Sequence, residues 1–315
     1  MNALTVAEQV SRVFAGIGVA LLVATVVGYV LKVSVAQRQP HGVIDNLNAR
    51  IRSWWMIVAI VGIALMFGRE GITLLFAIIS FVTLREFTAP VSTGRGNGLL
   101  AFSFFVVLPA QYLLVWLGWS DLYSIFVPVC AFILMPIVAP VAIHDRRLAE
   151  CVPTIQLGLL ICVFCISHVP ALLALDIAGY EEHNLLLIVF LMVVVQSSDV
   201  LQYIWGKLCG RRKVAPAISA SKTWEGLIGG IASATGIGTA LFWITPFTPL
   251  EAAAMAVAVN ALGVLGSFTM SAIKRGRRIK DWGSLIEGHG GMLDRLDSMV
   301  FAAPVFFYVT RLGWG

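Results

Sequence analysis

At residues 184–205 the chain reads NLLLIVFLMVVVQSSDVLQYIW, a run in which Asp199 is the only charged side chain. A helix of this length is about 33 Å long and can cross the roughly 30 Å hydrocarbon core of a bilayer. The stretch therefore predicts a transmembrane helix that carries one acidic residue near its end.

The whole chain has the same apolar character. Of its 315 residues, 59% are hydrophobic and only 12% are charged, whereas soluble domains average roughly 25% charged residues. The mean hydropathy is +0.89. These values exclude an ordinary soluble enzyme, a disordered chain and a fibrous protein. The net charge of +5 resides in loops between apolar segments, so we expect membrane lipids or phosphate substrates as partners, and no nucleic acid.

We expect an all-α, polytopic integral membrane protein with about ten transmembrane helices. Segments 54–67 and 72–88 are short, so a tilted or re-entrant path stays open for them. Segment 13–31 is longer than the apolar core of a signal peptide, which favours a retained helix. The ten candidate segments are 13–31, 54–67, 72–88, 98–118, 122–143, 153–175, 184–205, 223–244, 251–273 and 298–313.

The lysines and arginines predict the orientation of these segments. Alternate loops carry every Lys and Arg of the chain except Arg12, Arg69 and Arg311. Cytoplasmic loops are enriched in these residues. The pattern therefore predicts five cytoplasmic loops and places both termini on the non-cytoplasmic side. We expect an N-terminal part with transmembrane helices and cytoplasmic loops at 1–150, and a C-terminal transmembrane domain with the functional motifs at 151–315.

Asp199 lies inside an apolar segment, where charged side chains are costly and usually functional. A helix-end carboxylate paired with a cation of the next loop is the structural alternative. That loop reads GKLCGRRK at residues 206–213 and SASKTWEG at residues 219–226. Glycines allow close approach of backbone to a ligand, and the cations can bind anions. Ser219 or Ser221 is expected to cap the following helix, whose N–H groups then face the same region.

The last cytoplasmic loop carries the strongest functional pattern. Residues 271–297 read SAIKRGRRIKDWGSLIEGHGGMLDRLD. Asp294 and Asp297 are three residues apart, so they share one face at a helix start. Carboxylates beside glycines and cations suit a magnesium–nucleotide site, in which oxygen ligands hold the metal and Lys or Arg side chains hold the phosphates.

This region resembles the signature of the phosphatidate cytidylyltransferases, the CDP-diacylglycerol synthases. The resemblance covers roughly residues 196–300. Three positions depart from the family pattern, namely Gln202, Ala220 and Glu287. The matching positions of the last loop are Ser271, Lys274, Arg275, Lys280, Asp281, Gly283, His289, Gly290, Gly291, Asp294, Arg295 and Asp297. The upstream matches are Asp199, Tyr203, Gly206, Gly210, Ser219, Lys222, Thr223, Trp224, Glu225 and Gly226.

The resemblance implies that CTP and phosphatidate, or a similar lipid phosphate, give CDP-diacylglycerol and pyrophosphate. A phosphomonoester is largely ionised at neutral pH, since its second pKa is about 6, so the acceptor needs no general base. Repulsion between the two anionic substrates calls for a divalent metal. We therefore expect Mg²⁺ as the cofactor and leave a second ion open. The predicted metal ligands are Asp281, Asp294, Asp297 and, more weakly, Asp199.

The remaining predicted roles concern the substrates and the location. The predicted catalytic residues are Lys274, Arg275, Lys280, Asp281, Asp294 and Asp297. The predicted substrate-binding residues are Lys222, Thr223, Ser219, Tyr203, His289 and Arg295. Pairing with nearby aspartates is the alternative for each cation, and interfacial anchoring is the alternative for Tyr203 and Trp224. The resemblance implies a homodimer. We expect the site to face the cytoplasm, in a bacterial inner membrane, and Asp294→Asn to abolish turnover without unfolding.

Rival hypotheses remain open. A transporter for an anionic substrate would fit Asp199 and the basic loops but has no obvious use for the D-R-L-D stretch. A relative with another lipid-phosphate acceptor, and a paralogue that binds without turnover, are further alternatives. The pattern of the CDP-alcohol phosphatidyltransferases is not found in the sequence.

Overall fold

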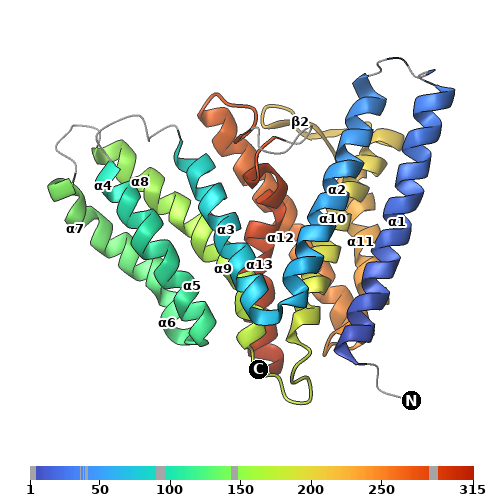
Figure 1. Ribbon diagram of the computed structural model, residues 1–315. Coiled ribbons are helices and arrows are strands. Elements are labelled where there is room, and N and C mark those ends of the chain that lie inside the picture. Colours follow the sequence, from blue (N-terminus) through green and yellow to red (C-terminus); the bar gives the residue numbers. More distant parts are fainter. Residues whose placement is uncertain are drawn as a thin grey trace.

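A computed structural model describes residues 5–35, 37, 39, 42–89, 97–142, 148–283 and 290–315. The described chain is almost entirely helical, and most of its long helices run back and forth across one thick layer (Figure 1). The strands found in it form a single short antiparallel hairpin at one end of that layer. The predicted all-α polytopic class is confirmed.

The N-terminal part begins with three long helices. They are α1 (Val6–Ser34), α2 (Gly42–Met66) and α3 (Gly68–Thr88). The hydroxyl of Thr5 accepts from the backbone N–H of Glu8, whose carboxylate accepts from Thr5 in turn, so α1 starts with a capping box. Gly68 has a φ of +59°, a value that suits glycine at the sharp turn from α2 to α3.

The middle of the chain forms three continuous helical segments, and each contains a π-helical turn. The first contains α4 (Asn97–Phe102), η1 (Ser103–Val107) and α5 (Leu108–Leu117). The second contains α6 (Ser120–Ile125), η2 (Phe126–Ala131) and α7 (Phe132–Ala142). The third contains α8 (Leu148–Leu159), η3 (Leu160–Cys165), α9 (Ile166–Ala171) and η4 (Leu172–Ala174). Such turns insert one residue into a helix and shift the face that follows.

The C-terminal part holds the elements that form the site. They are α10 (Asn184–Leu208), β1 (Lys213–Ala215), β2 (Ser219–Thr223), α11 (Trp224–Ala240), η5 (Phe242–Ile244), α12 (Pro249–Gly276) and α13 (Leu293–Trp314). Helices α10 to α13 pack against one another. Thr248 and Glu251 form a capping box at the start of α12.

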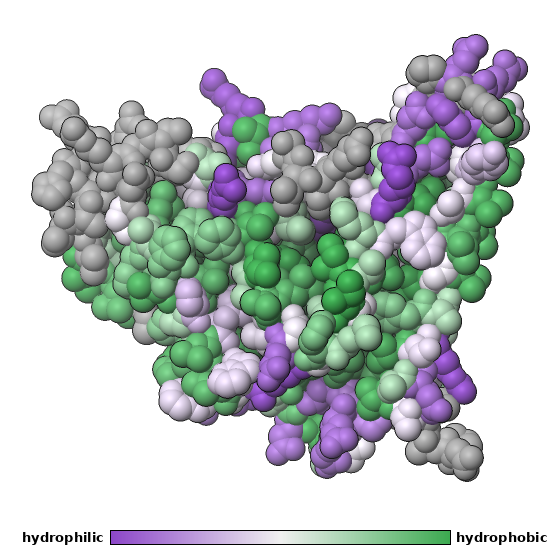
Figure 2. Space-filling model, in the orientation of Figure 1, coloured by the Kyte–Doolittle hydropathy of each residue, from purple (hydrophilic) through white to green (hydrophobic). Residues whose placement is uncertain are grey.

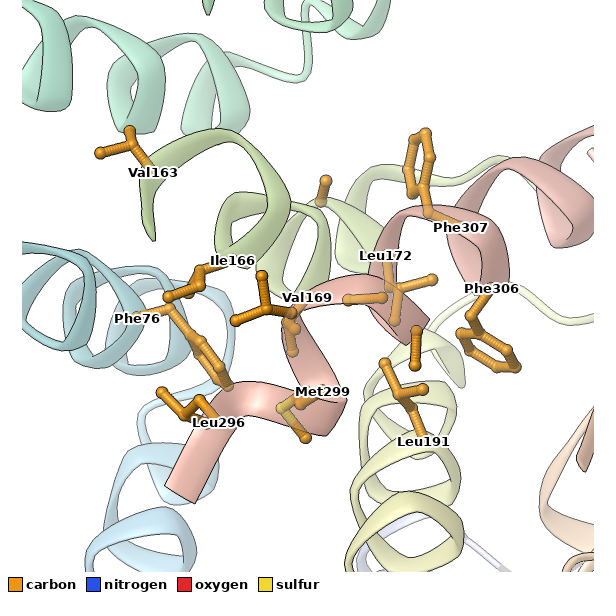
Figure 3. Packing of buried hydrophobic residues seen from close by; sticks show 14 of the residues in the cluster. Phe76, Val163, Ile166, Val169, Leu172, Leu191, Leu296, Met299, Phe306 and Phe307 are labelled. Carbon is orange, nitrogen blue, oxygen red and sulfur yellow. The ribbon is translucent and has the colours of Figure 1, made fainter. Parts of the chain in front are cut away.

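The apolar core joins both halves of the chain around α13. Leu296, Met299, Phe306 and Phe307 of α13 lie among side chains of α3, α9 and α10 (Figure 3). Phe76 of α3 is among them. The core therefore contains residues from both sides of position 150, and the division into two domains at that position stays a prediction.

Eight helices of the described chain are long and apolar enough to cross a membrane. They are Val6–Ser34, Leu47–Met66, Gly68–Thr88, Gly98–Leu117, Ser120–Ile137, Cys151–Ala174, Asn184–Leu208 and Pro249–Gly276. The short predicted segment 72–88 falls within Gly68–Thr88, and all of segment 54–67 except its last residue falls within Leu47–Met66. Helices α11 and α13 are not among the eight, so the count of ten stays a prediction. Apolar residues form a band between two polar ends (Figure 2).

The start of α1 and the end of α13 lie at the end of the bundle opposite to β2 (Figure 1). The C-terminal ends of α1, α3, α10 and α12 lie at the hairpin end. This arrangement agrees with the loop alternation derived from the charges, and the side of the membrane that each end faces stays a prediction.

Candidate active site

A polar cluster joins three helices of the C-terminal part to the strand before α11. The hydroxyl of Ser298 donates to Asp199 Oδ1 at 3.0 Å and lies 3.4 Å from Asp297 Oδ1. The hydroxyl of Ser267 donates to Asp297 Oδ2 at 2.9 Å, and Lys222 Nζ donates to Ser267 Oγ at 2.8 Å. Motifs about a hundred residues apart in sequence therefore meet at one place, which we call the Asp199–Asp297 cluster.

The cluster brings two carboxylates together with two cations. Asp199 and Asp297 are near enough for their like charges to interact, and the cations of Lys222 and Arg295 also act on Asp199. Arg295 also interacts electrostatically with Asp294. Two carboxylates in a partly buried site repel each other unless cations compensate them, so this arrangement favours the binding of a cation or of a charged ligand that brings one.

Asp294 lies in a separate, tighter arrangement. Its Oδ1 accepts from Lys274 Nζ at 2.6 Å, and the side chains of Lys274 and Asp294 are only 12% and 5% exposed. Its Oδ2 accepts from the backbone N–H groups of Trp282 and Gly291 at 2.8 and 3.0 Å. Both carboxylate oxygens are therefore engaged. Asp294 thus contacts both ends of the loop between α12 and α13 (residues 277–292, the signature loop) and also Lys274 of α12. Lys274 therefore forms an ion pair with an aspartate, which is the structural alternative to a phosphate contact.

Glu86 is a site residue that the sequence analysis missed. It stands near the end of α3, and its two carboxylate oxygens accept from the backbone N–H groups of Met292 and Leu293, each at 2.9 Å. The sequence held one signal for it, because Glu86 is an acidic residue within the predicted apolar segment 72–88. The rule that singled out Asp199 applies to it equally.

Phe87, the residue after Glu86, contacts the first part of the loop between α12 and α13. Arg277 Nη1 donates to the backbone oxygen of Phe87 at 2.6 Å, and its guanidinium lies 4.2 Å from the centre of the Phe87 ring. The Trp282 ring stacks on Phe87 at 4.9 Å. Partial burial lowers the pKa of the Arg277 guanidinium from its ordinary value. The end of α3 is thus a platform for the loop between α12 and α13.

Thr223 determines where α11 begins. Its hydroxyl accepts from the backbone N–H of Gly226 at 3.2 Å, and it is the N-cap of the helix. The expected cap at Ser219 or Ser221 is wrong, because residues 219–223 are extended in β2 and only Thr223 adjoins the first turn. Glycine is required nearby, since a Cβ on Gly210 would lie 2.7 Å from the Thr223 hydroxyl.

The basic loop before β1 is held by an acidic residue of α11. Glu225 accepts from the backbone N–H groups of Arg211 and Arg212 at 3.0 to 3.3 Å. Arg275 Nε donates to the backbone oxygen of Ile218 at 3.4 Å and so joins the end of α12 to the hairpin. A cavity of about 530 Å³ opens at this loop. Its lining residues are Leu208, Cys209, Gly210, Arg211, Arg212 and Glu225.

The other predicted site residues lie around these contacts. The Tyr203 ring is exposed and has the cations of Arg50 and Lys207 over it, at 5.3 and 5.8 Å. Lys280 and Asp281 are exposed in the first part of the loop that follows α12. His289 and Glu287 fall outside the described residues.

The predicted metal ligands do not form one group. Among the residues that the structure describes, no three His, Cys, Asp or Glu side chains are arranged to hold a metal ion. Asp199 and Asp297 share the hydroxyl of Ser298, whereas Asp294 is engaged by Lys274 and backbone N–H groups. Three of the four predicted aspartates therefore divide between two arrangements, whereas Asp281 is exposed in the loop that follows α12. Mg²⁺ stays a proposal.

Comparison with known proteins gives the family. Residues 48–312 match the model of the cytidylyltransferase family. The uncharacterized protein YnbB of Escherichia coli strain K12 is 35% identical over 295 residues, which cover 92% of this chain and 95% of that protein.

Enzymes named phosphatidate cytidylyltransferase match the chain over a shorter stretch. The enzyme of Haemophilus influenzae is 36% identical over 157 residues, or 45% of this chain and 53% of that protein. The enzyme of Pseudomonas aeruginosa is 40% identical over 133 residues, or 41% and 49%. These alignments span about half the length of the named enzymes. The family match covers most of the chain, and the chain therefore belongs to the cytidylyltransferase family, as a CTP-dependent nucleotidyltransferase with membrane-spanning helices.

Proposed function

We propose that the chain transfers the cytidylyl group of CTP to phosphatidate or a similar lipid phosphate, and releases pyrophosphate. The observation that carries the proposal is the Asp199–Asp297 cluster, in which carboxylates from α10 and α13 lie beside Lys222 of β2. The names of the relatives over the matched region support phosphatidate as the acceptor.

The reaction needs position and charge more than proton transfer. A phosphate oxygen of the lipid attacks the α-phosphorus of CTP, and the bond from that phosphorus to the bridging oxygen of the β-phosphate breaks. The electron pair leaves with pyrophosphate. The attacking oxygen is already ionised at neutral pH. Cations at the site must therefore offset repulsion between the lipid phosphate and the triphosphate. Lys222 and Arg295, whose charges act on Asp199, are proposed for this task.

A divalent metal fits the donor chemistry of the cluster. Asp199 and Asp297 provide paired carboxylate oxygens, and such oxygens are the ligands that Mg²⁺ prefers. The metal would neutralise charge on the triphosphate and on the departing pyrophosphate. Asp294 is the weaker candidate, because a metal would compete with Lys274 and two backbone N–H groups for its oxygens.

The site is proposed to face the cytoplasm of a bacterial inner membrane, where CTP is present. The lipid stays in the bilayer and presents its phosphate from the side, between the helices α10 to α13, while CTP arrives from water. A homodimer is proposed from the family resemblance. This placement lets one protein join a water-soluble substrate to a membrane-bound one.

The test uses purified protein in detergent or lipid with α-labelled CTP, Mg²⁺ and phosphatidate, and follows label into the organic phase. We expect label that requires phosphatidate and falls at least about 100-fold in Asp297→Asn, a loss typical of a removed charge-stabilising group. Asp121→Asn is the matched control, because Asp121 is 93% exposed and pairs with Arg311 in a surface ion pair of small energetic value.

Other outcomes of the same assay separate the alternatives. Label that appears only with a different lipid phosphate would keep the chemistry and change the substrate. Absence of label with every acceptor, in folded protein, would contradict the proposal and favour a transporter or a binding paralogue. Full activity of Asp297→Asn would remove the Asp199–Asp297 cluster from the mechanism.

A further inference from the structure

We propose that Glu86 is a positioning residue of the nucleotidyltransferase, which holds the start of α13 and with it the signature aspartates. The kinetic part of this inference rests on the proposed function. Glu86 belongs to α3, in the N-terminal half, and lies more than 180 residues before the signature loop in sequence. The inference therefore gives that half a direct role in organising the site.

The first argument is the geometry of the contact. A helix begins with N–H groups that have no partner within the helix, and an acidic side chain near them is favourable. At α13 the preceding residue, Met292, is the N-cap and provides no side-chain hydrogen bond. Glu86 supplies the missing acceptor from another helix, because each of its oxygens takes one N–H group, of Met292 and Leu293.

The second argument is the fit of the loop around this carboxylate. A Cβ placed on Gly283 would lie 2.8 Å from Glu86 Oε1, and a Cβ on Gly291 would lie 2.6 Å from Oε2. Both distances are shorter than real Cβ contacts allow. Gly283 and Gly291 thus approach Glu86 so closely that a methyl group at either position would have to displace its carboxylate. This close approach gives two glycines of the motif a role that needs no contact with substrate.

The third argument is the path from Glu86 to the reacting groups. The backbone N–H of Gly291 donates to Asp294 Oδ2 at 3.0 Å, and the next N–H, of Met292, donates to Glu86. Glu86 and Asp294 therefore bind neighbouring backbone groups of the same turn. Asp297 lies one helical turn further along α13 and belongs to the Asp199–Asp297 cluster. Both oxygens of Glu86 are engaged by backbone, so it acts through position and not by binding a ligand.

The experiment compares Glu86→Gln with Glu70→Gln. Glutamine keeps the size of the side chain but replaces one acceptor oxygen with an NH₂ donor. That donor would face the backbone N–H of Met292 or Leu293, so one hydrogen bond is lost. Glu70 is an exposed acidic residue in the first turn of the same helix, so its variant changes the same charge at the opposite end. Gly291→Ala is a second test, since its methyl group would displace the same carboxylate.

We expect kcat to fall about 10- to 100-fold in Glu86→Gln, because misplacement of reacting groups by about 1 Å costs this much. The KM for CTP should change far less. Amide hydrogen exchange at Met292 and Leu293 should be at least about tenfold faster, with α10 and α12 unchanged. The double variant of Glu86→Gln and Gly291→Ala should lose little more kcat than either variant alone, since both disturb the same contact of the Glu86 carboxylate with the start of α13.

The outcomes judge the inference separately from the proposed function. Unchanged exchange at Met292 and Leu293 in Glu86→Gln would overturn it, whatever the activity. Faster exchange with wild-type kcat would overturn the positioning role as well. If the wild-type protein transfers no label to phosphatidate, the acceptor is wrong. In that case amide exchange judges the inference by itself: faster exchange at Met292 and Leu293 supports it, and unchanged exchange overturns it.

Discussion

Three aspartates of the motifs differ in what they contact, and this difference predicts different effects of mutation. Asp199 and Asp297 contact the hydroxyl groups of Ser298 and Ser267. An asparagine can accept from a hydroxyl as well, so their Asn variants should fold normally. Asp294 instead contacts the ammonium group of Lys274 in a buried place. Loss of its charge is therefore a structural change as well as a chemical one.

Asp294→Asn is expected to lower the stability of the protein in addition to its turnover. The sequence alone led us to expect lost turnover in a folded protein. The structure predicts a loss of stability as well, because removal of the Asp294 charge leaves Lys274 as an uncompensated buried cation. We expect the free energy of unfolding to fall by about 3 kcal/mol. Thermal unfolding in detergent should therefore show a lower midpoint for Asp294→Asn than for Asp297→Asn.

The double variant Lys274→Met with Asp294→Asn gives the control for this expectation. It removes the unpaired cation, so its midpoint should recover most of the loss while label transfer stays absent. Equal midpoints for Asp294→Asn and the wild type would show that the ion pair contributes nothing measurable to stability.

At the scale of elements, the contact between α10 and α11 sets the position of Lys222 and Thr223. Gly226 lies against the backbone of α10, and a Cβ on it would be 2.8 Å from the backbone oxygen of Gln202. A Cβ on Gly230 would meet Gln202 at 2.3 Å. These close approaches allow the two helices to pack with their backbones nearly in contact, as small residues do in membranes.

Gly226→Ala should separate α11 from α10 at the site and abolish most label transfer. Because the methyl group meets backbone and not a flexible side chain, we expect a loss of about 1–3 kcal/mol in stability as well. Gly236→Ala in the same helix is the matched control, since nothing lies within 4 Å of the added atom. It should be neutral or stabilising by up to about 1 kcal/mol. Thermal unfolding and label transfer of the two variants check this expectation, and similar losses for both would contradict it.

Sequence periodicity and charge could predict the helices but not all of their contacts. The run 184–205 corresponds to most of α10, because a long apolar stretch in a bilayer has few alternatives to a helix. The aspartates of the last loop were found because they lie close together in sequence. Glu86 could have been selected as an acidic residue within an apolar segment, but its partners could not be predicted. Met292 and Leu293 are more than 200 residues away in sequence, and no local pattern reports such a contact. The cap at Thr223 was misplaced because β2 extends to that residue.

At the scale of the whole molecule, the site lies where two halves of the chain meet. The helix α13 passes through the shared apolar core, with Phe76 of α3 and Leu191 of α10 packed beside it (Figure 3). The start of the same helix takes contacts from Glu86 of α3 and Lys274 of α12. A displacement of α3 would thus reach the reacting groups through a rigid, packed helix. The N-terminal helices are expected to be needed for turnover, not only for insertion in the membrane.

The orientation of the molecule makes a prediction for chemical labelling. Cys209 is exposed at the end of α10 beside the basic loop, whereas Cys151 and Cys162 are buried. If the alternate basic loops face the cytoplasm, a membrane-impermeant maleimide should modify Cys209 in inverted vesicles and not in intact spheroplasts. Cys209→Ser should remove the signal. Asp121→Cys in that background places a thiol at an exposed site on the predicted outer side, and it should react in intact spheroplasts. Labelling of Cys209 from outside would reverse the orientation and place the site away from CTP.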